Sequence, residues 1–242
     1  MVRIRWAGRA VAAVAAAGLL GGAVVGCGAG GDAKGAADGE ATGVVRISPI
    51  AGQLAKLPAR VDGPKVVVGR VDAPHTAQVL VDPRCGACGK FEESGGEVLL
   101  RLAGEGRVKV EYLLASFLDQ GGASGSVKAV NALRASVDAG KFAEYNAAVF
   151  ASQPRGRFTD EYLLKIADEV PGLRGEAFDK AVREGTHKGW VAEAEKGFEA
   201  TGAQGTPLVL VDGEPVGAKD GSMFDSGTFA ATLKGVGVGA AA

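Results

Sequence analysis

Residues 79–88 read VLVDPRCGAC, a short apolar run that leads into two cysteines separated by two residues. Two thiols at this spacing can form a small disulfide that opens and closes easily, provided that one is a low-pKa thiolate and the other can resolve a mixed disulfide. We expect Cys85 to begin a helix, where unpaired N–H groups and the positive end of the helix dipole stabilise a thiolate. Cys88 then lies one turn later on the same face, more deeply covered. The pattern predicts that Cys85 attacks or is attacked and that Cys88 resolves the mixed disulfide.

A cysteine pair can also hold zinc or form a purely structural disulfide. A structural zinc site usually needs four ligands, and this chain adds only two histidines, in different contexts. His75 follows a proline and is expected in a loop, and His187 is expected on the surface at the start of a helix. A disulfide that closes so small a loop constrains the unfolded chain little. The redox interpretation is therefore favoured over both.

The residues around the cysteine pair predict one strand–helix–strand unit. Residues 66–68 and 77–81 are short runs rich in β-branched side chains, separated by turn residues, so both are expected to be strands. The helix that Cys85 opens is expected to continue to about Leu102. Residues 108–113 alternate apolar and polar side chains and predict a third strand.

A helical block of about residues 120–202 is expected before the chain returns to strands. Thr159 has the features of an N-cap, with two acidic residues in the following turn, and that helix is expected to end before Pro171. Apolar side chains recur through the block three and four residues apart, a spacing typical of helices with one buried face. We assign these positions to the core, without a cofactor role: Val127, Val130, Leu133, Val137, Phe142, Tyr145, Val149, Trp190, Ala194 and Phe198.

The C-terminal part is predicted to form a hairpin and a last helix. Residues 208–211 and 214–216 flank an Asp-Gly turn, and the helix is expected at about residues 225–234. Thr206-Pro207 stands directly before the first of these strands, after a glycine-rich turn. A trans proline at the first residue of a strand is the commoner arrangement, but the combination with an upstream cysteine pair favours a cis peptide bond.

The N-terminus has the pattern of an export signal. Three arginines stand among the first nine residues, and residues 10–25 are uncharged and rich in alanine, valine and leucine. This stretch runs directly into Cys27, which resembles the signal of bacterial lipoproteins, whose cysteine receives diacylglycerol and becomes the first residue of the mature protein. Residues 1–26 are therefore predicted to be a lipoprotein signal peptide and Cys27 the lipidation site. An uncleaved anchor or ordinary secretion stays open, although the apolar run falls short of the ~20 residues that span a bilayer comfortably.

The chain after Cys27 divides into a tether and a domain. Residues 27–43 are mostly small and polar, as in a flexible tether, and residues 44–242 are expected to fold. The whole chain of 242 residues is 47% hydrophobic and 23% charged, which is typical of a globular protein. Loss of residues 1–26 removes three of the 27 basic residues and none of the 28 acidic ones, so the net charge changes from −1 to −4. A mildly acidic protein is a poor nucleic-acid binder, and no nucleic-acid partner is expected.

An export signal, a cysteine pair that opens a helix, a helical block and Thr-Pro before a hairpin together resemble the thioredoxin superfamily. The resemblance is closest to its DsbA-like branch, the thioredoxin-4 type of secreted bacterial proteins, and covers about residues 60–236. Residues 71–92 match that family's approach to its active site. The resemblance implies an α/β thioredoxin-like fold, a central mixed sheet flanked by helices, with an inserted helical subdomain and no cofactor or metal.

The same resemblance implies the roles of the site residues. In that family the first cysteine is the exposed nucleophile and the second is buried. The residue before the cis-proline offers its backbone to an extended substrate peptide, a form of strand addition. The catalytic residues implied here are Cys85 and Cys88, and the substrate-binding residues are Thr206 and Pro207.

The chain departs from the family's strongest oxidants between the cysteines. Those proteins carry Pro-His there, and the histidine helps to lower the thiol pKa, whereas this chain has Gly86-Ala87. We therefore predict a less acidic Cys85 thiol and a less oxidising couple than in DsbA itself. Asp82, three residues before Cys85, is expected to be either a proton-handling carboxylate near Cys88 or an exposed turn residue.

The predicted function is that of an extracytoplasmic protein thiol–disulfide oxidoreductase that donates disulfides to exported proteins. It would be lipid-anchored through Cys27 to the outer face of the bacterial cell membrane, and a redox partner must recycle it. Two alternatives stay open: a disulfide reductase in heme or metal-centre assembly, and a non-catalytic thioredoxin-like binding lipoprotein. The presence of Cys85, Cys88 and Pro207 argues against the second alternative, because a scaffold alone needs none of them.

Overall fold

The computed structural model describes residues 42–239, so Cys27 and the predicted signal peptide lie outside the described residues. Within that range no helix combines the length and the apolar character needed to cross a bilayer. In chain order the elements are α1 (Ala51–Leu54), β1 (Ala59–Asp62), β2 (Lys65–Val68), β3 (His75–Val81), α2 (Gly86–Phe91), η1 (Glu92–Gly96), α3 (Glu97–Gly104), β4 (Val108–Leu114), η2 (Gln120–Gly122), α4 (Ser126–Asp138), α5 (Phe142–Ala151), α6 (Asp160–Asp168), α7 (Glu176–Glu184), α8 (Lys188–Ala200), β5 (Leu208–Val211), β6 (Glu214–Pro215), η3 (Ser222–Phe224) and α9 (Ser226–Gly235).

The strands form one mixed sheet in the order β1-β2-β4-β3-β5-β6. Strands β3 and β4 run parallel, with His75 opposite Val108 and Val81 opposite Leu114, and the other neighbouring pairs are antiparallel. Parallel neighbours need a long crossover connection, which the continuous helical segment α2–η1–α3 supplies. The predicted strand–helix–strand unit and the C-terminal hairpin are both confirmed.

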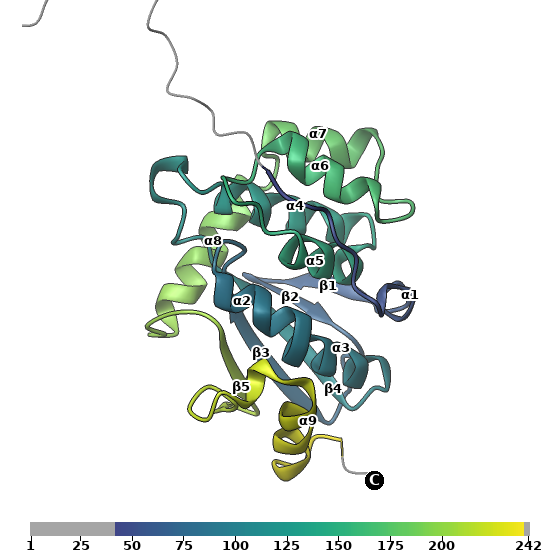
Figure 1. The fold of residues 1–242 in the computed structure, drawn as a ribbon, viewed down its shortest axis with the longest axis vertical. Helices are drawn as coiled ribbons and strands as arrows, with labels where there is room; N and C mark the ends of the chain where they lie inside the picture. Colours follow the sequence, from purple (N-terminus) through teal and green to yellow (C-terminus); the bar gives the residue numbers. More distant parts are fainter. Residues whose placement is uncertain (1–41, 240–242) are drawn as a thin grey trace, which may run out of the picture. The chain divides into compact units, whose positions relative to one another are not determined.

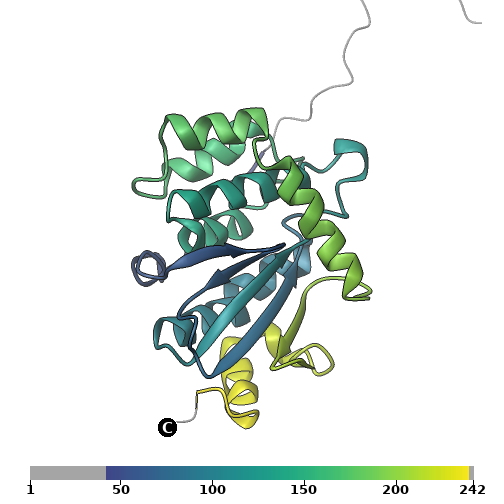
Figure 2. The same cartoon turned by 180° about the vertical axis from the view of Figure 1, so that it is seen from behind.

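Helices lie on both faces of the sheet. Figure 1 shows α2, α3 and α9 in front of the strands, and Figure 2 shows α8 beside the opposite face. Helices α4 to α8 lie between β4 and β5 in the chain, and α4 to α7 gather beyond one side of the sheet (Figure 1). This arrangement is the thioredoxin-like fold with a helical insertion that the sequence predicts.

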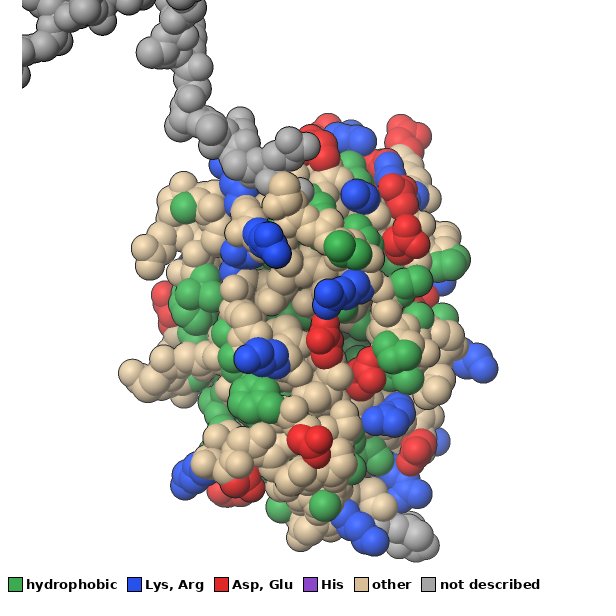
Figure 3. All heavy atoms as spheres, in the orientation of Figure 1, with side chains coloured by type: hydrophobic (Ala, Val, Ile, Leu, Met, Phe, Trp, Pro, Cys, Tyr) green, Lys and Arg blue, Asp and Glu red, His purple; other side chains and the backbone are tan. Residues whose placement is uncertain are grey.

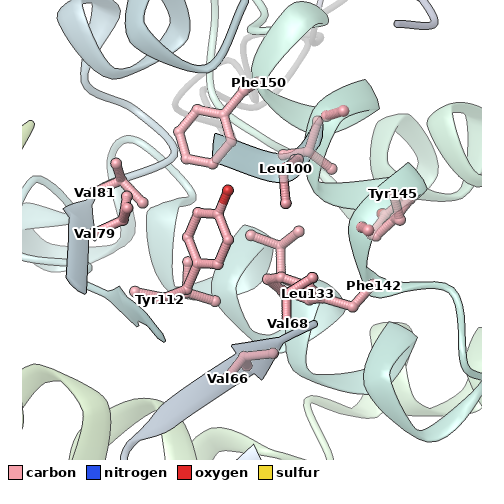
Figure 4. Close-up of a cluster of buried hydrophobic side chains, with 14 of the residues drawn as sticks. Val66, Val68, Val79, Val81, Leu100, Tyr112, Leu133, Phe142, Tyr145 and Phe150 are labelled. Atoms are coloured by element: carbon pink, nitrogen blue, oxygen red, sulfur yellow. The ribbon is translucent and has the colours of Figure 1, made fainter. Parts of the chain in front are cut away.

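The main core joins the sheet to the insertion. Figure 4 shows valines of β2 and β3 and Tyr112 of β4 among side chains from α3, α4 and α5. Tyr112 packs edge-on against Phe142 of α5, with 5.5 Å between ring centroids, and both side chains are buried. Burial of one such side chain stabilises the fold by roughly 1.5–3 kcal/mol. The insertion is therefore packed on the sheet by apolar contacts as well as connected to it by the chain.

Local signals in the insertion act as predicted. The Thr159 hydroxyl accepts a hydrogen bond from the N–H of Tyr162 at 3.2 Å and caps α6, which ends before Pro171. Gly185, with φ of 65°, ends α7 in the left-handed conformation that glycine tolerates best. Of the apolar positions assigned to the core, all are buried except Val127 and Trp190, which are partly buried and pack against it.

Three local features differ from the sequence-based expectations. His75 is the first residue of β3 rather than a loop residue, because its strand pairs with β4 from that position onward. Helix α1 and strand β1 are not predicted from the sequence, since neither short segment contains a run of apolar or β-branched side chains. The helix that follows Cys85 extends to Gly104 and contains the π-helical turn η1. A Cβ on Gly95 of η1 would lie 2.6 Å from the carbonyl oxygen of Met223, so this turn lets η3 pack directly on backbone.

Charged side chains of both signs are scattered over the described surface that contains α2 and α3 (Figure 3). Figure 3 shows Asp and Glu among Lys and Arg on this face, with small apolar areas between them. Such mixing differs from the basic stripe typical of a nucleic-acid-binding face.

Candidate active site

The cysteine pair lies where β3 passes into α2. Cys85 occupies the N-cap position with an extended backbone (φ −75°, ψ 114°), and Cys88 lies in the first turn. The N–H of Cys85 donates to the carbonyl of Asp82 at 2.9 Å, which closes a turn just before the helix. Cys85 is partly exposed, whereas Cys88 is fully buried. This difference in solvent exposure is the one expected for an accessible thiol and a buried thiol that resolves its mixed disulfide.

The pKa values of the two thiols are shifted in opposite directions. A hydrogen bond from the Cys88 thiol lowers the pKa of Cys85 to about 5, although partial burial opposes the shift. Thr206 and the backbone N–H groups of Cys88 and Ala87 lower this pKa further. Burial raises the pKa of Cys88 far above its usual range, and the hydrogen bond to Cys85 adds to the rise. The lowered pKa favours the thiolate form of Cys85 at neutral pH, and the Cys88 thiol is the donor that stabilises it most.

The helix N-terminus contributes to this ionisation, as the sequence predicts, but the neighbouring thiol has the larger effect. Sequence reasoning placed Cys88 on the same face without assigning it this donor role. The donor role follows from burial, because a buried thiol stays protonated and can donate a hydrogen bond to the Cys85 sulfur one turn earlier.

Thr206-Pro207 lies beside the cysteines. The peptide bond is cis, as predicted, and β5 follows it, paired with β3 through Leu208 opposite Leu80. The carbonyl oxygen of Thr206 lies 3.4 Å from the Cys85 sulfur. The Thr206 side chain lowers the pKa of both thiols through its hydroxyl. The structure thus brings together the predicted site residues of the domain, whereas Cys27 lies outside residues 42–239.

Asp82 is buried, so its interpretation as an exposed turn residue is wrong. Its carboxylate accepts hydrogen bonds from the N–H of Arg84 at 2.8 Å, the N–H of Leu118 at 3.1 Å and the hydroxyl of Ser126. Burial raises the pKa of Asp82 despite these bonds, and the Cys85 charge adds to the rise. The carboxylate therefore links the C-terminal end of β3 to the loop after β4 and to the start of α4.

The segment after α5 holds the active-site loop from the other side, and sequence reasoning did not predict this. The side-chain amide of Gln153 donates to the carbonyls of Pro83 at 2.7 Å and Cys85 at 2.9 Å. The Arg84 guanidinium donates to the carbonyl of Pro154 at 2.8 Å. No local sequence signal marks Gln153, because its acceptors lie about 70 positions earlier in the chain.

A partly exposed aromatic side chain lies next to one of the residues that bind Asp82. Phe117 is 39% exposed and stacks on Phe198 of α8, with 5.2 Å between ring centroids. Its neighbour Leu118 is the residue whose N–H binds Asp82.

A second buried carboxyl group lies further along the same helical segment. Glu92 of η1 accepts hydrogen bonds from the Tyr112 hydroxyl at 3.3 Å and the Asn146 amide at 3.2 Å, both through Oε2. Its Oε1 has no partner among the described groups. Burial raises the pKa of Glu92 to about 8. Sequence reasoning missed this residue because a glutamate in a helix ordinarily faces solvent.

The histidines do not join the cysteines. His75 Nδ1 lies 2.7 Å from Asp212, and His187 is the N-cap residue of α8, with its Nε2 3.4 Å from Asp138. Between residues 42 and 239 there is no cluster of three or more His, Cys, Asp or Glu side chains arranged to hold a metal ion.

Comparisons with known proteins agree on the family. The family model described as Thioredoxin, of the thioredoxin-4 type, matches residues 62–226, which is more than half of the chain. A curated protein, the hydroxyurea phosphotransferase of Kitasatospora aureofaciens, is 78% identical over 32 residues. These residues are 13% of this chain and only 9% of that protein, so the match carries no argument about activity.

Solved structures share the fold. MdbA from Corynebacterium matruchotii, a thiol-disulfide oxidoreductase, has a TM-score of 0.58 and 19% identity, and the match covers 69% of this chain and 92% of MdbA. BdbD from Bacillus subtilis has a TM-score of 0.56 and 18% identity, with 80% and 97% covered. DsbA from Mycobacterium tuberculosis has a TM-score of 0.52 and 17% identity, with 74% and 98% covered. At these identities the likeness concerns the fold, and it confirms the thioredoxin-like architecture.

Proposed function

Because this chain belongs to the thioredoxin family of the thioredoxin-4 type, we propose that it is an extracytoplasmic thiol–disulfide oxidoreductase that donates its Cys85–Cys88 disulfide to exported proteins. The observation that supports this most directly is the arrangement of the two thiols: Cys85 is partly exposed at the N-cap of α2, and the buried Cys88 one turn later lowers its pKa. A stabilised Cys85 thiolate favours the reduced protein over the disulfide, and a couple whose reduced form is stabilised is the stronger oxidant. This favours disulfide donation over disulfide removal.

The proposed reaction begins with the oxidised protein. A substrate thiolate attacks the Cys85 sulfur, the Cys85–Cys88 bond breaks, and Cys88 leaves with the electron pair and takes up a proton in its buried position. A second substrate thiolate then attacks the substrate sulfur of the mixed disulfide and releases Cys85 as a thiolate. The substrate loses two electrons and gains a disulfide, while the protein gains those two electrons as a reduced cysteine pair. A separate redox partner has to reoxidise it.

Cys85 suits the role of the attacked sulfur for two reasons. It is the more exposed of the two, and its low pKa makes it a good leaving group in the second step. The Thr206 backbone lies within 3.4 Å of that sulfur, where it can pair with an extended substrate segment as an added strand.

The location is proposed from the N-terminal sequence. We infer that Cys27 is lipidated and that the protein is held at the outer face of the bacterial cell membrane, where a catalytic disulfide can stay oxidised. Mass spectrometry of the N-terminal peptide should find a diacylglyceryl group on Cys27. Cys27→Ala should release the protein from membranes, and a variant that remains in the membrane fraction would contradict the anchor.

The reduction potential tests the direction of the reaction. Protein that begins at residue 27 and carries Cys27→Ser has Cys85 and Cys88 as its remaining thiols and can be equilibrated in glutathione buffers. A potential above about −180 mV supports disulfide donation. A potential near or below about −270 mV would instead favour a reductase, as in heme or metal-centre assembly. Alkylation of Cys85 as a function of pH should be half-maximal near pH 5.

A further inference from the structure

Gln153 reaches the active-site loop from the end of α5. Its side-chain nitrogen donates to the carbonyl oxygens of Pro83 at 2.7 Å and Cys85 at 2.9 Å. Both acceptors are backbone atoms that immediately precede α2. We propose that Gln153 is a positioning residue for exchange at Cys85: it holds the Cys85 backbone so that the sulfur stays within reach of the groups that stabilise its thiolate. This inference rests on the proposed function, because it assigns Gln153 a part in that reaction.

The Cys85 backbone needs such support because it stands outside the helix. As the N-cap residue it has an extended backbone, and the first helical hydrogen bond, from the Gly89 N–H to the Cys85 carbonyl, is long at 3.2 Å. The groups that lower the pKa of Cys85 include the Cys88 thiol and the N–H groups of Ala87 and Cys88, all fixed on the helix. A small rotation of the Cys85 backbone therefore changes the distance from its sulfur to each of these donors.

The orientation of the Gln153 amide is set by contact with α2. A Cβ added to Gly89 would lie 2.7 Å from Oε1 of Gln153, so the amide oxygen lies against the helix and the nitrogen faces the loop. Because Oε1 is the far end of a flexible side chain, Gly89→Ala should move the amide without breaking the fold. This gives a second way to disturb the contact while Gln153 itself stays in the chain.

Gln153 also stands on a fixed backbone. The hydroxyl of Ser152 donates to the carbonyl of Arg46 at 3.2 Å and accepts from the Arg46 N–H at 2.8 Å. On the other side, Arg84 donates to the carbonyl of Pro154 at 2.8 Å. A positioning group is effective only when its own supports are held in this way.

Three variants test the proposal: Gln153→Ala, Gln153→Glu and Gly89→Ala. Each should raise the pH of half-maximal Cys85 alkylation and lower the equilibrium constant for reduction of the protein by glutathione. We expect about a tenfold change for Gln153→Ala, equivalent to a potential lower by about 30 mV. Gln153→Glu should have the larger effect, because it keeps the size but replaces the donor with an anion that faces two carbonyls. The matched control Gln53→Ala, an exposed position on α1, should leave both quantities unchanged.

Stability measurements separate a positioning role from a merely structural one. If Gln153→Ala and Gln153→Glu remain folded by urea denaturation but keep the wild-type alkylation profile and equilibrium constant, the proposal is overturned. The proposal is also overturned if the variants lose stability while the alkylation profile and the equilibrium constant of the folded protein stay unchanged. Failure of the proposed function would look different: the wild type itself would exchange no disulfides, while the alkylation profile of Cys85 would still report whether Gln153 positions its sulfur.

Discussion

Replacement of Glu92 by glutamine should remove a pH-dependent loss of stability. The Glu92 side chain is 3% exposed, with both of its hydrogen-bond donors, Tyr112 and Asn146, on the same carboxyl oxygen. Burial raises its pKa from the ordinary 4.5 to about 8. Glutamine has nearly the same shape and keeps an oxygen acceptor, but it does not ionise. The variant therefore changes the protonation of the site with little change in packing.

The sign of the effect follows from the protons bound in each state. Between pH 4.5 and about 8 the folded protein keeps a proton on Glu92 that the unfolded chain has released. The free energy of unfolding therefore falls as the pH rises through this window, by about 1.4 kcal/mol per pH unit for this group. The loss over the whole window is at most roughly 5 kcal/mol. Above the folded pKa this contribution changes no further.

Urea unfolding of wild type and Glu92→Gln at pH 5, 7 and 9 measures this contribution. Cys85 titrates in the same window with the opposite sign, because its folded pKa is lowered to about 5, but its effect is shared and cancels in the difference. The variant should match wild type near pH 5 and exceed it by a few kcal/mol at pH 9. The exposed neighbour Glu93 supplies the matched control, Glu93→Gln, which should follow the wild-type curve. A Glu92→Gln difference that stays constant from pH 5 to 9 would refute the reasoning.

Three further predictions concern the site and its supports. Cys88→Ala should accumulate mixed disulfides between Cys85 and substrates, visible by non-reducing electrophoresis and mass spectrometry, and their absence would favour a non-catalytic binding protein. Asp82→Ala leaves three donors without their acceptor, so the free energy of unfolding should fall by about 2–4 kcal/mol in urea, and an unchanged midpoint would contradict the assigned network. Gly95→Ala places a Cβ 2.6 Å from a backbone carbonyl of η3 and should cost about 1–3 kcal/mol, whereas Gly86→Ala, with open space around its Cβ, should not destabilise the protein. Equal melting temperatures for those two variants would count against the close packing of η1 on η3.

The parts of the fold that could be predicted from sequence are those with local signals. A β-branched run before two cysteines predicts the passage from β3 into α2, and an Asp-Gly turn between apolar runs predicts the hairpin of β5 and β6. Thr159 marks the start of α6 because a cap acts on the next residues in the chain. The two cysteines of the candidate site could be predicted in the same way, because they lie within one of these local sequence patterns.

The rest of the site depends on contacts between distant segments. Asp82 is buried because Leu118 and Ser126, 36 and 44 residues later, supply its donors. Gln153 reaches Cys85 across 68 residues, and Glu92 is buried because Tyr112 and Asn146 meet it from other elements. In each case a polar side chain occupies a place that its own neighbours in sequence do not predict.

The hydrogen bonds of the active-site loop also limit how the helical insertion can move. Ser126 at the start of α4 binds Asp82, and Gln153 after α5 binds Cys85, so the insertion is fastened to residues 82–85 at two places. A rigid swing of these helices about a hinge would have to break both connections. The proposed substrate contact at Thr206 therefore does not require these helices to lift as a lid. If the insertion opens locally on a slower timescale, hydrogen exchange should detect that opening. The same opening should change the surroundings of the Cys85 sulfur.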